Sequence, residues 1–372
     1  MSWVACSDVS EFLRSRGAEL KAHESTHNLA WAAIRQAQVA GPHAAEESFF
    51  TFNAGETSTA HAFVNTSRQH LTLSTMTPTQ AEKLAHFLVS RNTELTVAEG
   101  PQKPVHAFVR EWSSKTGCAY KIQFNQGLYE LTRVNMPDLE GGHLVLANHN
   151  HTGIVEKFVT GFWRDCFPNE PSAQAMMSER AHRFLSRQNA YLWQNRNHEL
   201  VSMAVVIRES PNTSSISGVY TDPNHRSRGY AARTVASLSQ ACIDAGKTAC
   251  NLYTDLENNT SNSVYIRIGY SMIQQSTRIR IMRPAATTDH EMTLSYRTVD
   301  FQLVSDCTLL AKWLNDPALK HLYSRFTDAE NFAQDFSPEH FQRMHPVAAN
   351  KRTGQEFMVL VDGTPIGTAN FE

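Results

Sequence analysis

The stretch from Val219 to Ala231, Val-Tyr-Thr-Asp-Pro-Asn-His-Arg-Ser-Arg-Gly-Tyr-Ala, decides the fold. A β-branched and aromatic run stops at a proline-containing turn, and a basic loop with one glycine then leads directly into a helical pattern. The first turn of a helix presents unpaired N–H groups and the positive end of the helix dipole, which together suit an anion. With two arginines in the loop, the stretch predicts a pyrophosphate site and therefore a phosphorylated carrier as the ligand.

The loop differs from two common phosphate-binding sequences. It is neither Gly-x-x-x-x-Gly-Lys-Ser/Thr nor Gly-x-Gly-x-x-Gly after a first strand. It fits Arg/Gln-x-x-Gly-x-Gly/Ala and so resembles the acyl-CoA loop of the GNAT superfamily of N-acetyltransferases. For this segment alone, a basic turn that caps a surface helix is the alternative. The six residues are Arg226, Ser227, Arg228, Gly229, Tyr230 and Ala231.

A second segment, Asn258 to Tyr270, is similar to the other GNAT signature, Asn-x-x-Ala/Ser-x-x-x-Tyr-x-x-x-Gly-Phe/Tyr. Asn258 and Ser261 can start a helix, and Gly269 can end one in a left-handed cap. An ordinary short helix with a buried tyrosine is the alternative. Two motifs in the order and spacing of the family argue against it.

The elements around the motifs also follow GNAT order. The pattern predicts helices, a strand–turn–strand, the loop-plus-helix, and two further strands separated by the second motif's helix. We therefore expect residues 140–283 to form a catalytic α/β (α+β) domain with the GNAT acyl-CoA N-acyltransferase fold, a mixed, mostly antiparallel sheet flanked by helices. The segments concerned are 153–167, 172–185, 191–193, 201–207, 229–245, 249–254 and 272–281.

Residues 1–137 predict a degenerate GNAT-like domain, so that the chain resembles bacterial GNAT proteins with a tandem arrangement. Helices are expected over 9–39, 81–89 and 105–112, the second starting with a capping box at Thr77 and the third ending at Gly117. Strands are expected at 49–52, at 71–73 and over 120–134, with a turn at Asn125-Gln126-Gly127. Because this part lacks the phosphate loop, we expect it to bind no CoA and to form one wall of the acceptor cleft.

Residues 282–293 predict a linker, and 294–372 a partial GNAT-like C-terminal segment. We expect a strand at 296–303, a helix at 306–315 and a hairpin of 357–361 with 364–371. The segment resembles the opening of a GNAT domain of the kind that acylates aminoglycosides or siderophore amines. Two explanations stay open: a domain cut short, or a half-domain that completes a sheet with another part of the protein or another subunit.

The composition excludes several classes of function. A formal net charge of −2 over 372 residues argues against nucleic acid or an anionic membrane as partner. No apolar run is long enough to span a bilayer, and the N-terminus lacks a secretion signal. The six cysteines are scattered, as in a cytoplasmic protein with reduced thiols. His149 and His151 lack a cysteine or carboxylate at ligand spacing, so we expect no metal. The oligomeric state is not indicated.

The resemblance implies transfer of an acetyl group from acetyl-CoA to a primary amine of a small molecule or peptide, by direct attack in a ternary complex. In the family, a bulge in the strand matching 201–207 separates it from the strand matching 217–221, and the pantetheine arm binds backbone groups there. Here these groups belong to Val219, Tyr220 and Thr221, while the amides of the six-residue loop take the pyrophosphate. The resemblance also implies that Asn258 and Asn262 contact the carrier and that Tyr265 is the general acid toward the sulfur.

The general base stays open between Glu209, Asp255, Glu156 and a water chain. Two alternatives to this function also stay open. The first is a CoA-binding sensor or scaffold without catalysis, which the tandem layout suggests. The second is an acetyltransferase that serves self-resistance by acetylating an antibiotic or toxin. The resemblance of residues 294–372 to aminoglycoside-acylating domains suggests it by analogy.

Overall fold

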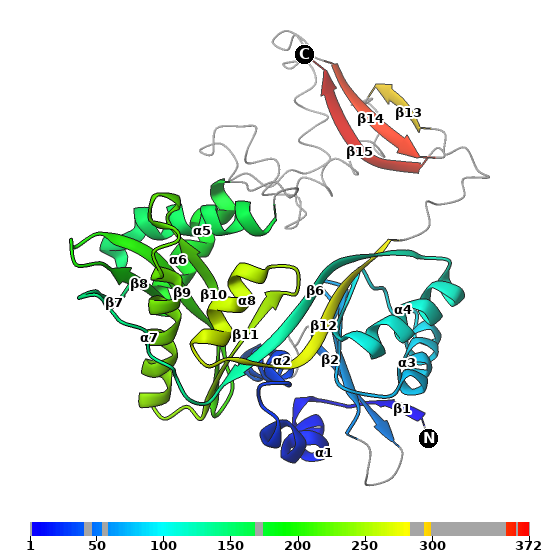
Figure 1. Ribbon diagram of the computed structural model, residues 1–372. Coiled ribbons are helices and arrows are strands. Elements are labelled where there is room, and N and C mark those ends of the chain that lie inside the picture. The colour runs from blue at the N-terminus through cyan, green and yellow to red at the C-terminus, as the bar shows by residue number, and fades with distance from the viewer. Residues whose placement is uncertain are drawn as a thin grey trace. The chain divides into compact units, whose positions relative to one another are not determined.

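The computed structural model describes residues 2–40, 47–53, 59–167, 174–282, 294–298, 355–361 and 364–371. The chain divides into two compact units, Met1–Pro284 and Ala285–Glu372. The first contains one 12-stranded sheet, with helices on both faces (Figure 1).

The large unit repeats one order of elements in two halves. The first half comprises β1 (Ser2–Ala5), α1 (Val9–Ala22), α2 (Asn28–Ala40), β2 (Glu47–Asn53), β3 (His61–Asn65), β4 (His70–Leu73), α3 (Pro78–Ser90), β5 (Val97–Pro101), α4 (Gln102–Thr116) and β6 (Ala119–Leu131). The second half comprises β7 (His143–Leu146), α5 (Thr152–Cys166), α6 (Gln174–Ser186), β8 (Ala190–Gln194), β9 (Leu200–Glu209), β10 (Thr213–Thr221), α7 (Tyr230–Asp244), β11 (Ala249–Asp255), α8 (Asn259–Arg267) and β12 (Ser271–Met282). Single-turn 3₁₀ helices, η1 (His149–His151) and η2 (Pro223–His225), precede α5 and α7.

The two halves exchange their last strands. The sheet order is β1-β2-β3-β4-β5-β12-β6-β11-β10-β9-β8-β7. β12 therefore lies between β5 and β6 of the first half, and β6 lies between β12 and β11 of the second, with antiparallel pairing throughout. Both long strands run through the middle of the unit in Figure 1. The boundary predicted between residues 137 and 140 thus divides two halves of one sheet within one compact unit.

The exchange predicts how fragments behave. A fragment of residues 138–284 lacks β5 and β6, so β11 loses one paired neighbour and exposes an edge, and β12 loses both of its neighbours. We expect this fragment to aggregate on expression, whereas residues 1–284 remain folded with a cooperative urea transition. Sedimentation and circular dichroism of both fragments check this. A soluble, cooperatively unfolding 138–284 fragment would contradict the exchange.

The turn predicted at Asn125-Gln126-Gly127 is wrong, because these residues lie inside the continuous strand β6. Gly127 pairs with Thr254 on one side and with Gln275 on the other. Hydrogen bonding along both edges keeps the segment extended despite its local turn signal. The glycine answers a packing need, since a Cβ there would lie 2.6 Å from the ring of Tyr129.

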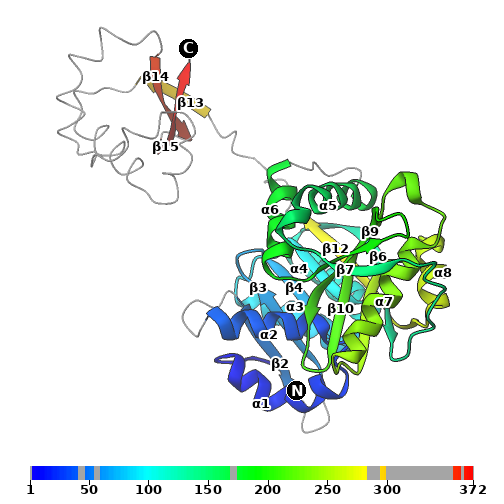
Figure 2. The same cartoon turned by 90° about the vertical axis from the view of Figure 1, so that its left-hand side faces the viewer.

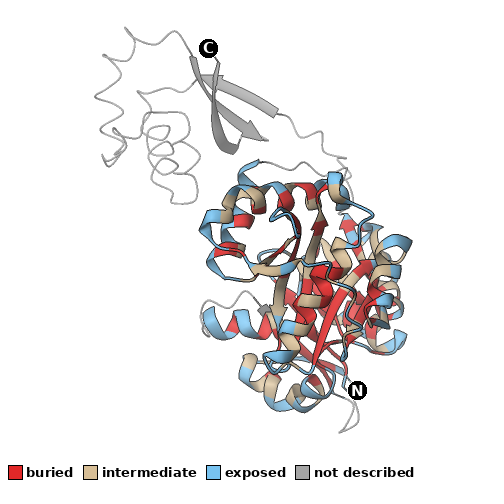
Figure 3. Cartoon of the chain, turned by 60° about the vertical axis from the view of Figure 1, so that its left-hand side comes forward, coloured by how far each residue is buried: buried red, intermediate tan, exposed pale blue. Residues whose placement is uncertain are grey.

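Helices cover both faces of the second half. Ala204 on β9 packs with the residues of α7 and α8, while its neighbours Met203 and Val205 pack with those of α5 and α6. Neighbouring strand residues point to opposite faces, so the two helix pairs lie on opposite sides of the sheet. Figure 3 shows the buried residues concentrated in the sheet and on the inner sides of the helices.

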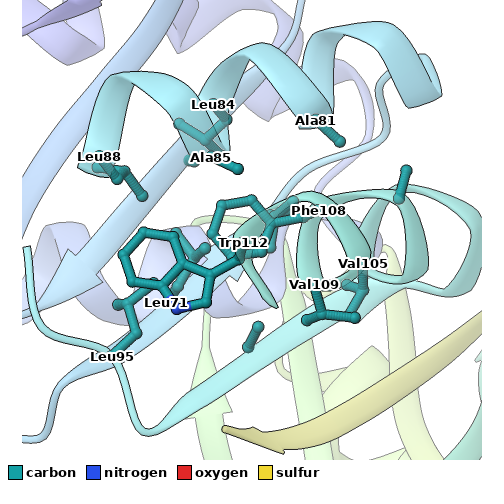
Figure 4. Packing of buried hydrophobic residues seen from close by; sticks show 14 of the residues in the cluster. Leu71, Ala81, Leu84, Ala85, Leu88, Leu95, Val105, Phe108, Val109 and Trp112 are labelled. Carbon is teal, nitrogen blue, oxygen red and sulfur yellow. The ribbon is translucent and has the colours of Figure 1, made fainter. Parts of the chain in front are cut away.

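One hydrophobic cluster of the first half lies between α3, α4 and the sheet, and a second lies between α1, α2 and the sheet. Figure 4 shows Leu84 and Leu88 of α3 above Phe108 and Trp112 of α4, whose rings stack with centroids 5.6 Å apart. The predicted capping box at Thr77 is confirmed. α4 ends at Gly117 as predicted, and Gly117 has a left-handed φ of 71°.

The connection between α1 and α2 binds the second half. The buried Glu24 carboxylate accepts hydrogen bonds from the Ser210 hydroxyl (2.5 Å) and from the main-chain and side-chain nitrogens of Asn212 (2.7 Å each). Figure 2 shows α2 reaching the strands of the second half. The first half is thereby held against the turn between β9 and β10.

Replacing Glu24 by Ala should destabilise the large unit by about 2 kcal/mol, because the buried Ser210 hydroxyl and two nitrogens of the exposed Asn212 lose their acceptor. Urea unfolding of the full chain measures this. The matched control is Glu179→Ala, which removes an exposed ion pair with Arg183 and should change stability by less than about 0.5 kcal/mol. Equal effects of the two variants would contradict the contact's role.

The second unit contains an antiparallel sheet of β13 (Leu294–Thr298), β14 (Gln355–Val361) and β15 (Thr364–Phe371). The predicted hairpin of 357–361 with 364–371 is confirmed. The predicted linker after Met282 and the helix at 306–315 lie outside the described residues.

Candidate functional site

The second half opens between β10 and β11. Their parallel pairing runs from Thr213 with Ala249 to Ile216 with Leu252 and then ends. β10 stays paired with β9 as far as Thr221 with Ser202. The separation predicted between β9 and β10 is therefore wrong: the opening has β10 on one side and β11 on the other.

The physical cause is an extra residue in β10. From Ser217 to Tyr220 this strand advances three residues while β9 advances only two, from Val205 to Met203. Such a bulge bends its strand, and Gly218 takes a φ of +62° within it. β9 also has an irregularity, opposite Ser215 and Ile216, but its pairing with β10 resumes.

The backbone of β10 presents alternate residues to the opening. The Tyr220 carbonyl accepts a hydrogen bond from the Ser202 hydroxyl (2.9 Å), and the Asp222 N–H donates to the Val201 carbonyl (3.0 Å), so both face β9. By alternation, the backbone groups of Thr221 face the opening, and so does the Val219 carbonyl, which precedes the Tyr220 N–H on the β9 side. Of the three predicted backbone partners, these two therefore point toward β11.

The loop after β10 leaves the start of α7 uncapped. Gly229 is the N-cap of α7, with a φ of +80° and no side-chain hydrogen bond to the first turn. The equivalent helix of the first half, α3, starts with a capping box in which Thr77 and Gln80 bond each other's backbone N–H. The difference gives a physical reason why the first half is expected to bind no phosphate: its helix start is closed by its own side chains.

The two loop arginines differ in their contacts. The Arg226 side chain bonds Asp165 at the end of α5 (2.5 Å) and lies over the ring of Tyr220. It also donates to the Thr221 carbonyl (3.2 Å), which ties the loop to β10. Arg228 is held through its main-chain carbonyl, which accepts a hydrogen bond from the Arg233 side chain (2.7 Å).

Arg233, which neither motif predicts, fixes the loop after β10. Its buried guanidinium donates to the carbonyls of Arg228 (2.7 Å) and Asp138 (2.6 Å) and pairs with Glu140. It thereby fastens the loop after β10 to the segment that joins the two halves. The signal was available, since a cation in the first turn of a helix opposes the helix dipole and needs a specific partner.

The second motif forms α8 as predicted, with Asn258 as its N-cap. The Asn258 side chain accepts a hydrogen bond from the Ser261 N–H (3.0 Å). Asn262 donates through Nδ2 to the carbonyls of Asp255 (3.1 Å) and Leu256 (3.3 Å), while its buried Oδ1 has no partner among the described residues. A buried acceptor without a partner is costly, so Asn262 has capacity for a ligand donor.

Tyr265 and Cys166 approach the opening from opposite faces. Tyr265 on α8 is 8% exposed, and within the described residues its hydroxyl forms no hydrogen bond. Burial raises the pKa of Tyr265 well above its usual value, and the nearby Cys166 thiol at the end of α5 adds to the effect. Burial likewise raises the pKa of Cys166 to about 11, with contributions from Asp165 and Asp255. A phenol with a raised pKa stays protonated and can act as an acid.

The three carboxylates considered as general base are placed differently. Glu209 pairs with Lys247 (3.4 Å) and Arg35 (3.9 Å), and Glu156 lies 3.7 Å from His182. Asp255 ends β11, and its charge helps to raise the pKa of the Cys166 thiol. Cys166 in turn helps to raise the pKa of Tyr265. Among these three, Asp255 alone has such a link to Tyr265.

Two classes of feature are absent from the described residues. They hold no group of three or more His, Cys, Asp and Glu side chains that could bind a metal ion. In the predicted loop, His151 accepts the Asn148 N–H through Nδ1 (3.1 Å). No helix among them has the length and hydrophobicity needed to cross a membrane.

The topology and one family model identify the fold. Residues 195–279, which contain the opening, the loop and α8, match the family model of FR47-like protein, which is related to GNAT proteins. The large unit has a GNAT-like fold in a tandem arrangement. Its mixed, mostly antiparallel sheet flanked by helices confirms the predicted fold class, and the repeated order of elements confirms the tandem arrangement.

Several solved structures are similar to this GNAT-fold chain. A Drosophila protein has 15% identity and a TM-score of 0.54, covering 76% of this chain and 98% of its own. A GCN5-related N-acetyltransferase from Sphaerobacter thermophilus has 14% identity and a TM-score of 0.49, covering 76% and 96%. A tandem GNAT protein from the clavulanic acid biosynthesis pathway has 9% identity and a TM-score of 0.44, covering 77% and 99%. No curated protein matches the sequence.

Proposed function

We propose that this protein transfers an acetyl group from acetyl-CoA to a primary amine. The observation that carries the proposal is the uncapped start of α7 next to the unpaired edge of β10. Main-chain N–H groups between Arg226 and Ala231 would bind the diphosphate, and backbone groups of Val219 and Thr221 would bind the pantetheine arm. The free Oδ1 of Asn262 would accept a hydrogen bond from the carrier.

The chemistry needs positioning and two proton transfers. The amine nitrogen attacks the thioester carbonyl carbon, a C–N bond forms and the C–S bond breaks. Asp255, directly or through water, would take the proton that the amine loses. The protonated Tyr265 would give its proton to the departing sulfur. An acetyl-CoA substrate suits the cytoplasmic location that the cysteine pattern predicts.

Thiol release tests this function. The full chain is incubated with acetyl-CoA and each member of a panel of amines that includes amino acids, polyamines, peptides and an aminoglycoside. We expect release of free CoA with at least one amine, together with an acetylated product of the expected mass. Tight binding of CoA with no release across the panel would instead favour a CoA-binding sensor.

A further inference from the structure

Arg208, near the end of β9, is a partly buried cation with unused donors. Its Nε donates to Oδ1 of Asn28 on α2 (3.2 Å), and its guanidinium lies 5.9 Å from the centre of the Tyr253 ring. Among the described residues it forms no ion pair and no other hydrogen bond. The remaining N–H groups of the guanidinium are therefore available to a ligand.

The surroundings of Arg208 hold it in place without neutralising it. Asn28 is itself fixed, because its Nδ2 donates to the Ser25 carbonyl (2.6 Å) and the Tyr253 hydroxyl (3.2 Å). Arg208 is half-buried, and this burial lowers the pKa of its guanidinium. The carboxylate in electrostatic range, Glu99, lies 3.1 Å from His70 and 3.6 Å from Arg278. A cation withdrawn from water without a direct partner favours an anionic ligand.

The position of Arg208 connects it with the reaction site. Arg208 pairs with Ser215 of β10, the residue before the last β10–β11 pair. Tyr253 precedes Asp255 by two residues on β11, so their side chains lie on one face, about 7 Å apart along the strand. This face is opposite to that of Leu252, which packs with α7 and α8. An amine next to Asp255 could thus extend over Tyr253 to the guanidinium.

We propose that the amine acceptor carries a carboxylate, which Arg208 binds, so that the first half selects the substrate through Asn28. The proposal rests on the proposed function and names its substrate class. A guanidinium presents parallel N–H groups that match the two oxygens of a carboxylate. A monoanion fits better than a phosphate dianion, because one guanidinium supplies the positive charge and Glu99 is nearby.

The test compares amines that differ only in the carboxylate. Glycine, β-alanine, 4-aminobutyrate and 6-aminohexanoate are each paired with their carboxamide, and kcat/KM is measured by thiol release. For at least one chain length we expect the acid to exceed its amide by about tenfold or more. Arg208→Gln should abolish this preference while the carboxamides react at the wild-type rate. Equal rates for acids and amides in the wild type would overturn the proposal.

Two further variants separate a local loss from misfolding. Arg208→Lys keeps the charge without the planar fork, so the preference for acids should fall severalfold. If Arg208→Gln fails to fold, an unchanged preference in Arg208→Lys overturns the proposal. Arg183→Gln is the matched control, because Arg183 is exposed and already paired with Glu179, and it should leave the preference unchanged.

A binding measurement distinguishes failure of this proposal from failure of the proposed function. Calorimetry compares N-acetyl-4-aminobutyrate with its carboxamide on the wild type and on Arg208→Gln, and needs no turnover. Tighter binding of the acid that depends on Arg208, without thiol release from any amine, supports the carboxylate site and refutes the transferase. Thiol release with no preference for acids in rate or binding refutes the carboxylate site alone. If neither thiol release nor an Arg208-dependent preference for the acid is observed, both the transferase function and the carboxylate site are refuted.

Discussion

Replacing Gly229 by Val is expected to weaken binding of acetyl-CoA by at least about 100-fold. Gly229 has a φ of +80°, a region that a β-branched residue adopts only with strain of about 1–3 kcal/mol. A Cβ there would also lie 3.6 Å from Nη1 of Arg233, which holds the Arg228 carbonyl. Relief of the strain would turn the loop and displace the N–H groups proposed to bind the diphosphate. Calorimetry with acetyl-CoA measures the loss.

Gly246→Val provides the control at the other end of the same helix. Gly246 has a φ of +97°, and a Cβ there would meet nothing within 4 Å. This variant should therefore lose stability through comparable strain and keep its affinity for acetyl-CoA. If both variants lose affinity equally, or if Gly229→Val binds normally, the loop has a different role.

Replacing Tyr265 by Phe should lower kcat by about 100-fold or more and change the Kd of CoA by less than about twofold. The variant removes the proton that the departing sulfur would receive and preserves the buried ring. Since burial raises the pKa of Tyr265, the wild-type phenol stays protonated at ordinary assay pH. Steady-state kinetics gives kcat, and calorimetry gives the Kd.

Tyr270→Phe is the matched control for that substitution. Tyr270 is also buried, with its ring 6.1 Å from that of Tyr265, but its hydroxyl is bonded to Ser239 (2.8 Å). Loss of this hydrogen bond in Tyr270→Phe should reduce the free energy of unfolding and leave kcat unchanged. Normal turnover by Tyr265→Phe would remove Tyr265 from the role of acid.

Local signals were sufficient to predict most elements around the site. Asn258 and Gly229 start helices where the motifs indicated, and Thr77 forms its capping box, because these features depend on residues a few positions apart. The strand exchange could not be predicted in this way. Ala119 of β6 pairs with Met282 of β12, far along the chain, and nothing local specifies that partner.

In the candidate site, too, features set by neighbouring residues could be predicted and features set by distant residues could not. The loop, α8 and Tyr265 follow from motifs, whereas the opening was placed one strand away because the pairing of β10 depends on a bulge that the sequence does not mark. Arg233 had a local signal in its unfavourable place at a helix start. Arg208 had none, since its environment requires Asn28, 180 residues away.

The central claim is that main-chain N–H groups at the start of α7 bind the diphosphate of CoA. Calorimetry of the full chain with CoA and with pantetheine, which lacks the diphosphate and the adenosine 3′-phosphate, tests it most directly when the Gly229→Val variant is measured alongside. We predict that CoA binds at least about 100-fold more tightly than pantetheine and that Gly229→Val removes the difference. Equal weak binding of both compounds to folded wild-type protein, or no heat with CoA, would contradict the claim.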